Sequence, residues 1–126
     1  MTLKEKANDY AKAWCSGDPA AVAAHYAPDG RISINNGDDL IGTEAIRDMA
    51  AGFYAEFPDL KVHCDLVRSG GSHALFVWTL EGHHAETKNH VKAGGWEEWD
   101  LNDALQVVAS RGWFDADDYQ RQIDGA

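Results

Sequence analysis

Residues 74–86 constrain the fold of this chain more strongly than any other stretch. Between Leu75 and Leu80, apolar side chains occur at both odd and even positions, without the spacing of a helix. An apolar run this short is typical of a central strand that is covered on both faces. The run then turns polar, and His83 and His84 follow it. We therefore expect two imidazole rings at the point where a buried sheet opens onto a cavity.

Three helices are predicted at the start of the chain, over residues 2–17, 18–26 and 43–57. Thr2 and Glu5 have the spacing of a capping box, and apolar residues follow at helical intervals. Asp18 before Pro19 is a favourable start for the second, shorter helix. The third helix carries one apolar stripe and stops before Pro58. Such a stripe favours packing against the core over a cofactor site.

Alternating apolar and polar residues dominate the rest of the chain. Asn36-Gly37 and Gly70-Gly71 are turn signals between such segments. The polar segment 85–95 is expected to be a long hairpin loop or frayed strand ends, and residues 115–120 to form a final helical turn. The predicted strands span residues 31–35, 39–41, 60–68, 75–80, 96–101 and 105–110.

The order of these elements predicts the fold class. Helices followed by a meander of antiparallel strands is an α+β order. We expect a single domain over residues 1–126, in which a strongly curved antiparallel sheet wraps around the three N-terminal helices. Such a sheet forms a cone with one open end.

Charge and composition narrow the classes of partner. The chain has a net charge of -10 at pH 7 and no cluster of Lys and Arg, which argues against nucleic acid and against anionic membranes. Its N-terminus lacks the apolar run of a signal peptide, and no run approaches the length of a membrane span. A cytoplasmic protein is therefore expected. Cys15 and Cys64 are isolated, which is typical of buried cysteines in a reducing compartment.

Five short motifs resemble those of one protein family. Residues 78–84 resemble the W-t-x-t-G-T-H segment of the SnoaL-like polyketide cyclases, in the nuclear transport factor 2-like superfamily. The others are similar to Y-A-P-D-G at 26–30, G-x-E-A-I at 42–46, F-P-D-L at 57–60 and F-D-x-x-x-Y-x-R-Q at 114–122. The resemblance spans nearly the whole chain and implies the cone-shaped fold. It leaves the activity open, because this superfamily hosts isomerases, cyclases, lyases, hydrolases and proteins that only bind.

The resemblance also implicates His84. In the family the His of G-T-H belongs to the active site, and the matching position is His84, although His83 stands where the family has Thr. His84 shares strand parity with Trp78, so its imidazole faces the cavity if that face of the strand does. A neutral imidazole is a competent proton shuttle near neutral pH. The alternative is a partly exposed histidine that only forms hydrogen bonds.

A second candidate lies on the strand predicted over 96–101. One parity of this strand holds Trp96, Glu98 and Asp100, and the other holds Glu97, Trp99 and Leu101. The resemblance implies an acid/base Asp on this strand, best matched by Asp100. A carboxyl group desolvated by aromatic walls has a raised pKa and can act as an acid or a base. In the alternative, Glu98 and Asp100 face solvent while Trp99 and Leu101 face the core.

Aromatic side chains are expected to wall the cavity. Aromatic density of this kind is ordinary for a core, and it also suits a small hydrophobic ligand. The histidines near His84 lack the spacing of a familiar metal site, so neither a metal nor another cofactor is predicted. The residues predicted to bind the ligand are Trp14, Tyr26, Phe53, Phe57, Trp78, Trp96 and Glu98.

Two functions remain open. The first is a cofactor-independent enzyme of isomerase, cyclase, lyase or hydrolase type that uses Asp100 and His84 on a small hydrophobic molecule. An ionisable pair that converges on an apolar cavity favours this function. The second is a non-catalytic ligand-binding or dimerisation module, favoured if Glu98 and Asp100 point outward and tryptophans fill the cavity. The apolar residues on both faces of 75–80 also predict a homodimer through the outer face of the sheet.

Overall fold

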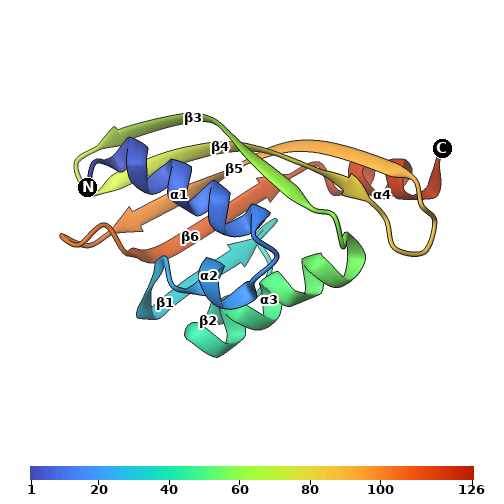
Figure 1. The fold of residues 1–126 in the computed structure, drawn as a ribbon. Coiled ribbons are helices and arrows are strands. Elements are labelled where there is room, and N and C mark those ends of the chain that lie inside the picture. The colour runs from blue at the N-terminus through green and yellow to red at the C-terminus, as the bar shows by residue number, and fades with distance from the viewer.

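The computed structural model describes residues 1–126 as four helices and one six-stranded sheet (Figure 1). The helices are α1 (Leu3–Cys15), α2 (Pro19–Ala23), α3 (Thr43–Glu56) and α4 (Ala116–Asp124). The strands are β1 (Tyr26–Ile34), β2 (Leu40–Ile41), β3 (Lys61–Gly70), β4 (His73–His83), β5 (His90–Leu101) and β6 (Val107–Phe114). The three predicted helices are present as α1, α2 and α3, with β1 and β2 between α2 and α3. None of the four is long and apolar enough to cross a membrane.

The sheet is mixed and open, with the strand order β2-β1-β6-β5-β4-β3. β3 to β6 form a meander of antiparallel hairpins, and β1 pairs antiparallel with β2. β1 and β6 are parallel, because the long connection through α3 and the meander brings the last strand beside the first. The predicted α+β class is confirmed. The expectation of a wholly antiparallel sheet is wrong for this one pair.

The helices start at the predicted caps and cover one face of the sheet. Thr2 Oγ1 accepts a hydrogen bond from the backbone N–H of Glu5, and Glu5 Oε1 accepts one from the backbone N–H of Thr2, both at 3.1 Å. Asp18 Oδ1 accepts from the N–H of Ala20 (3.0 Å) at the start of α2. α1 packs along β3 and α3 along β1, on the same side of the sheet (Figure 1). This side is called the inner face below.

β5 is longer than predicted. It starts at His90, so the loop between β4 and β5 covers residues 84–89 and not the whole of 85–95. Val91 and Ala93 are buried on the inner face of the strand, and Lys92 between them is exposed on the outer face. The stretch looks like a loop in the sequence because its buried side chains are few and small.

The C-terminal segment is a complete helix and not a single turn. Asp115 caps α4 by accepting a hydrogen bond from the N–H of Asp118 (3.0 Å). Ile123 is buried, and Gly125 takes a left-handed conformation with φ 78° just after the helix. Gln122 pairs its side-chain amide with the backbone of Lys92, donating to the carbonyl oxygen (3.0 Å) and accepting from the N–H (2.7 Å). α4 therefore covers the part of β5 that β6 does not reach.

Three aromatic rings form the centre of the core and fix the orientation of β5. Phe76 and Trp99 stack with ring centroids 5.0 Å apart and an interplanar angle of 11°. Tyr10 of α1 meets both rings edge-on, at 5.4 and 5.3 Å. All three side chains are buried, so the face of β5 that carries Trp99 is the inner face. Glu97 consequently also points inward, whereas Trp96 points outward.

Candidate functional site

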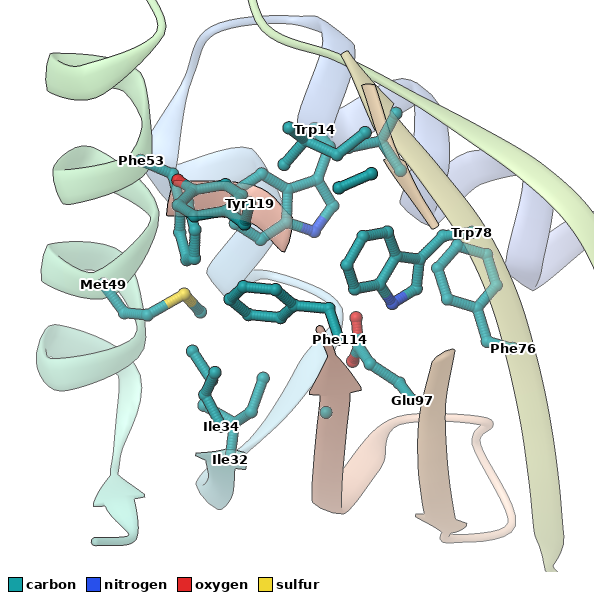
Figure 2. Close-up of a pocket in the computed structure, with 14 residues that line it drawn as sticks. Trp14, Ile32, Ile34, Met49, Phe53, Phe76, Trp78, Glu97, Phe114 and Tyr119 are labelled. Atoms are coloured by element: carbon teal, nitrogen blue, oxygen red, sulfur yellow. The ribbon is translucent and has the colours of Figure 1, made fainter. Parts of the chain in front are cut away.

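An apolar cavity lies between the helices and the inner face of the sheet (Figure 2). Its volume is about 60 Å³, small beside the roughly 300 to 1,000 Å³ of pockets that hold drug-sized ligands. Twelve of its 14 lining residues are hydrophobic, and Glu97 is the one with a carboxyl group. The lining residues are Trp14, Ile32, Ile34, Met49, Phe53, Val62, Phe76, Trp78, Leu80, Ala93, Glu97, Gly112, Phe114 and Tyr119.

Glu97 is held by hydrogen bonds to a single oxygen of its carboxyl group. The residue is 6% exposed. Its Oε1 accepts from Trp99 Nε1 at 2.9 Å and from Ser110 Oγ at 2.7 Å. The hydroxyls of Tyr10 and Tyr26 lie 3.2 and 3.3 Å from the same atom. The donors come from α1, β1, β5 and β6, so the fold as a whole positions this carboxyl group.

The two tyrosines share one donor position on Glu97. Each phenol has a single proton, and the hydroxyl oxygens of Tyr10 and Tyr26 are 2.7 Å apart. One tyrosine therefore donates to the other, and only the second can donate to Oε1. Oε1 then accepts three hydrogen bonds at most, from Trp99, Ser110 and one tyrosine.

The other oxygen of Glu97 faces the cavity. No protein donor lies within hydrogen-bond distance of Oε2, yet no buried side-chain oxygen lacks a partner. Oε2 is therefore accessible, and the cavity that Glu97 lines is the space it faces (Figure 2). Because Oε1 is surrounded by donors, the proton of a neutral Glu97 resides on Oε2. The site thus presents an O–H group, or one carboxylate oxygen, to an apolar space.

Burial controls the ionisation of this group. Desolvation raises the pKa of Glu97, while the hydrogen bonds from Trp99, Ser110, Tyr10 and Tyr26 act in the opposite direction. Burial, with the nearby carboxylate, also holds the pKa of both tyrosine hydroxyls well above the usual value. The phenols therefore stay protonated, and Glu97 is the group of this cluster that can gain or lose a proton.

A buried cation lies behind this cluster. Lys6 Nζ donates to His25 Nδ1 (2.9 Å) and to the carbonyl oxygen of His25 (2.8 Å), and the His25 ring meets Tyr10 edge-on at 5.5 Å. Burial lowers the pKa of Lys6 to about 8, and burial together with Lys6 lowers the pKa of His25 to about 4. At neutral pH His25 is therefore neutral, and Lys6 is charged.

The structure places Asp100, Glu98 and Trp96 on the outer face, so the expectation that they line the cavity is wrong. Asp100 Oδ1 accepts from His73 Nδ1 (2.7 Å) and lies 3.6 Å from Arg111 Nη2. Glu98 Oε2 accepts from Trp96 Nε1 (3.1 Å), and Trp96 is 41% exposed. The physical reason is the stacking of Trp99 on Phe76, which selects the other parity of β5 for the interior.

His84 also lies outside the cavity. It follows β4 in the loop, where its Nδ1 accepts from the backbone N–H groups of Glu86 and Thr87, both at 3.3 Å. Its ring packs edge-on against Phe57 at 5.5 Å. Asp100 is paired with His73 at the opposite end of the β4–β5 hairpin. The structure therefore does not bring the predicted acid/base pair together.

Three of the predicted ligand-binding residues line the cavity, namely Trp14, Phe53 and Trp78. Tyr26 lies behind Glu97 as a hydrogen-bond partner, and Phe57 is fully buried against His84 and Tyr119. The main residue that the sequence analysis missed is Glu97. Glu97 lies on the same face of the strand as Trp99. The alternative orientation, with Trp99 facing the core, therefore also turns Glu97 inward. The structure holds no group of three or more His, Cys, Asp or Glu side chains that could bind a metal.

A family model described as "SnoaL-like domain" matches residues 7–109. The chain belongs to the SnoaL-like domain family. The predicted resemblance is thereby confirmed. A Steroid Delta-isomerase from Nocardioides simplex is 38% identical to this SnoaL-like protein over 75 residues, which cover 56% of this chain and 57% of the relative. The chain thus spans little more than half the length of that curated relative.

Solved structures support the same fold at low sequence identity. A protein with a ketosteroid isomerase-like fold from Catenulispora acidiphila, in complex with trimethylamine, has a TM-score of 0.88 at 17% identity over 95% of this chain and 92% of its own. The epoxide hydrolase/cyclase-like enzyme SalBIII, from salinomycin pyran ring formation, has a TM-score of 0.80 at 16% identity over 91% and 92%. An NTF2-like protein from Burkholderia pseudomallei has a TM-score of 0.84 at 15% identity over 98% of both chains.

Proposed function

We propose that this SnoaL-like protein is a cofactor-independent acid/base enzyme that acts on a small hydrophobic molecule in the cavity. The observation that carries the proposal is the position of Glu97. Its Oε2 is the only carboxyl oxygen at an otherwise apolar cavity, while its Oε1 is held in place by the protein. A carboxyl group in such a setting has the raised pKa that general acid/base chemistry uses.

The two protonation states of Glu97 supply the two halves of this chemistry. In the neutral form, Oε2–H can donate to a carbonyl or alkoxide oxygen and stabilise the charge that develops there. In the ionised form, Oε2 can accept a proton from a carbon atom next to such a carbonyl. Relatives described as an isomerase and as an epoxide hydrolase/cyclase-like enzyme support reactions of this class. The apolar walls lower the local dielectric constant, which strengthens both interactions.

A non-catalytic ligand-binding module is the second candidate. Glu98 and Asp100 point outward, and Trp14 and Trp78 occupy much of the cavity wall. One carboxyl group, and not the predicted carboxylate–histidine pair, lines the cavity. The relative in complex with trimethylamine shows that a protein of this fold can be found with a very small ligand. We favour the enzyme because a buried carboxyl group with a free oxygen is costly to keep in a site that only binds apolar molecules.

We also propose that the protein forms a homodimer through the outer face of the sheet. Leu66 and Trp96 are 37% and 41% exposed there, and Leu75, Val77 and Trp113 are half-buried on the same face. A second copy would cover these side chains from water. Light scattering at micromolar concentration should give the mass of a dimer, and a monomer mass would count against this proposal.

The enzymatic proposal is tested by comparing a substitution of Glu97 with a matched substitution of Asp100. A screen of small carbonyl compounds by thermal shift identifies a bound molecule, and its conversion is then followed with wild type, Glu97→Gln and Asp100→Asn. Loss of one acid/base group reduces turnover by about 100- to 10,000-fold. We expect a loss of this size for Glu97→Gln and a rate within twofold of wild type for Asp100→Asn. A Glu97→Gln enzyme that keeps its rate would contradict the acid/base role of Glu97. Binding of carbonyl compounds by the wild type without conversion of any of them would leave the binding module as the better description.

A further inference from the structure

Trp78 has an indole N–H without a partner in the protein. Two other tryptophans of the sheet donate to carboxylates, Trp99 to Glu97 and Trp96 to Glu98. Trp78 Nε1 makes no hydrogen bond, and no buried side-chain nitrogen lacks a partner, so this N–H is accessible. Trp78 lines the cavity, and Figure 2 shows its nitrogen directed toward the side where the carboxyl group of Glu97 lies.

Gly95 fixes the position of this indole. Trp78 on β4 pairs with Gly95 on β5 in the register of the sheet. A Cβ atom at position 95 would clash with the backbone oxygen of Trp113 on β6, and would lie 2.5 Å from Cζ2 and 2.7 Å from Cη2 of the indole, which is closer than such atoms can approach. Only glycine lets the ring lie against the backbone of β5. The adjacent Gly94 has no such role, because its nearest neighbour would be a backbone oxygen at 3.9 Å.

We infer that Trp78 is a second ligand-positioning donor, and that a ligand oxygen accepts hydrogen bonds from Trp78 Nε1–H and Glu97 Oε2–H together. The inference rests on the proposed function, since it takes the neutral, acid form of Glu97. Both groups then donate, so the atom between them must be an acceptor. An ammonium group would meet the N–H of Trp78 as a second donor and is disfavoured.

The rest of the cavity defines the remainder of the ligand. Apart from Glu97, the lining side chains offer no carboxyl group, and twelve are hydrophobic. Two further lining residues carry polar groups: the indole N–H of Trp14, which makes no hydrogen bond, and the hydroxyl of Tyr119, which donates to Glu56 (3.2 Å). A charged group on the ligand would find no ion-pair partner beyond Glu97, which is unfavourable in an apolar space. A cavity of about 60 Å³ is smaller than one six-membered ring, so a one-ring ligand enters only with some outward movement of the aromatic walls, and a fused-ring system would need a much larger rearrangement. The ligand class is therefore a small ketone or its enol, with one oxygen on a hydrocarbon body of about one ring.

Cyclohexanone and methylenecyclohexane test the inference, because they differ only by an oxygen in place of a CH₂ group. Binding is measured by calorimetry for wild type, Trp78→Phe and Trp96→Phe, the last as a matched control on the outer face. One additional hydrogen bond corresponds to about tenfold in affinity. We expect wild type and Trp96→Phe to prefer cyclohexanone by at least about tenfold, and Trp78→Phe to lose most of this preference. An unchanged preference in Trp78→Phe would overturn the inference.

Two further measurements keep the test independent of the folding of a variant and of turnover. In wild type labelled with ¹⁵N-tryptophan, the Nε1–H resonance of Trp78 should move downfield when cyclohexanone is added and stay in place with methylenecyclohexane. Equal shifts with both probes would contradict the inference. Glu97→Gln retains an N–H donor but no acid, so it should keep the preference for cyclohexanone even where turnover is lost. If Glu97→Gln keeps full turnover, the acid/base proposal is wrong. The inference about Trp78 is still decided separately, by the binding preference of Trp78→Phe.

Discussion

The two faces of β5 carry carboxyl groups in opposite environments. Glu97 on the inner face is buried and receives its hydrogen bonds from neutral donors, namely Trp99, Ser110 and the tyrosine pair. Asp100 on the outer face is half-buried and pairs with His73 and Arg111. Both carboxyl groups therefore have partners, but only the outer one lies beside the side chains of a His and an Arg.

This difference separates a reactive group from a structural one. Partly exposed pairs such as those of Asp100 with His73 and Arg111 contribute little to stability. A carboxyl group among neutral donors in an apolar core has its pKa raised and keeps access to its proton. The candidate function therefore depends on which carboxyl group of β5 lies on the inner face, because both faces of this strand carry carboxyl groups.

The largest expected effect is that of removing the inner carboxyl group. Glu97→Ala leaves the donors of Trp99, Ser110 and the tyrosine pair without their acceptor, so we expect a loss of about 3 kcal/mol in the free energy of unfolding. Glu98→Ala on the outer face should cost about 0.5 kcal/mol or less. Urea denaturation of the two variants measures both values. Equal losses would show that the two faces do not differ in the way described.

A somewhat smaller effect is expected from the glycine beneath Trp78. Gly95→Ala would force apart the new methyl group, the indole of Trp78 and the backbone oxygen of Trp113, and overpacking of this kind costs about 2 kcal/mol. Gly94→Ala, on the outer face of the same strand, should change the stability by less than about 0.5 kcal/mol. Urea midpoints of the two variants give the comparison. If the Gly95→Ala protein were as stable as the Gly94→Ala protein, the position of the Trp78 indole would not depend on a glycine at residue 95.

The pH dependence of stability should also distinguish the two faces. Below a pH of about 4.5, the ordinary Glu pKa, Glu97 is protonated in both the folded and the unfolded state. Above it the unfolded chain loses this proton first, so stability falls as the pH rises toward the raised pKa of folded Glu97. The slope can reach about 1.4 kcal/mol per pH unit for one group. Wild type should show this decline relative to Glu97→Gln, and parallel pH profiles of the two would argue against a raised pKa.

The smallest effect is expected for Asp100→Asn. The pairs of Asp100 with His73 and Arg111 are partly exposed, so their loss should change the unfolding free energy by about 0.5 kcal/mol or less, and less still at high salt. Thermal unfolding at low and high salt measures this change. A loss of several kcal/mol would indicate that the outer face carries a structural network of its own.

Much of the fold could be predicted from local signals. The capping box at Thr2 and Glu5 and the Asp18-Pro19 start depend on neighbours in the chain, and both are confirmed. The parallel pairing of β1 with β6 was missed because residues far apart in the sequence make it. The early start of β5 was missed because its inner face holds small residues such as Ala93 and Gly95, which add little to the alternating apolar pattern of a strand.

The candidate site was harder to predict than the fold. Trp14, Phe53 and Trp78 were predicted correctly as cavity residues, since large aromatic side chains on apolar faces are buried in most arrangements. The choice between Glu97 and Asp100 depended on which face of β5 points inward. The sequence does not decide this, because each face carries a tryptophan and a carboxyl group. What decides between them is the stacking of Trp99 on Phe76 under Tyr10, a contact among three elements. Periodicity within a single strand contains no information about such a contact.

The central claim is that Glu97 is a cavity-facing acid with a raised pKa, and its own titration tests this most directly. The side-chain carboxyl carbon of Glu97 can be followed by ¹³C NMR from acidic to alkaline pH, with the Glu97→Gln protein used to assign its signal. We predict that this resonance titrates at a pH above the ordinary value of 4.5 for Glu, because desolvation outweighs the hydrogen bonds to Oε1. A titration at or below pH 4.5 would contradict the account, since Glu97 would then be an ordinary carboxylate held ionised by its donors.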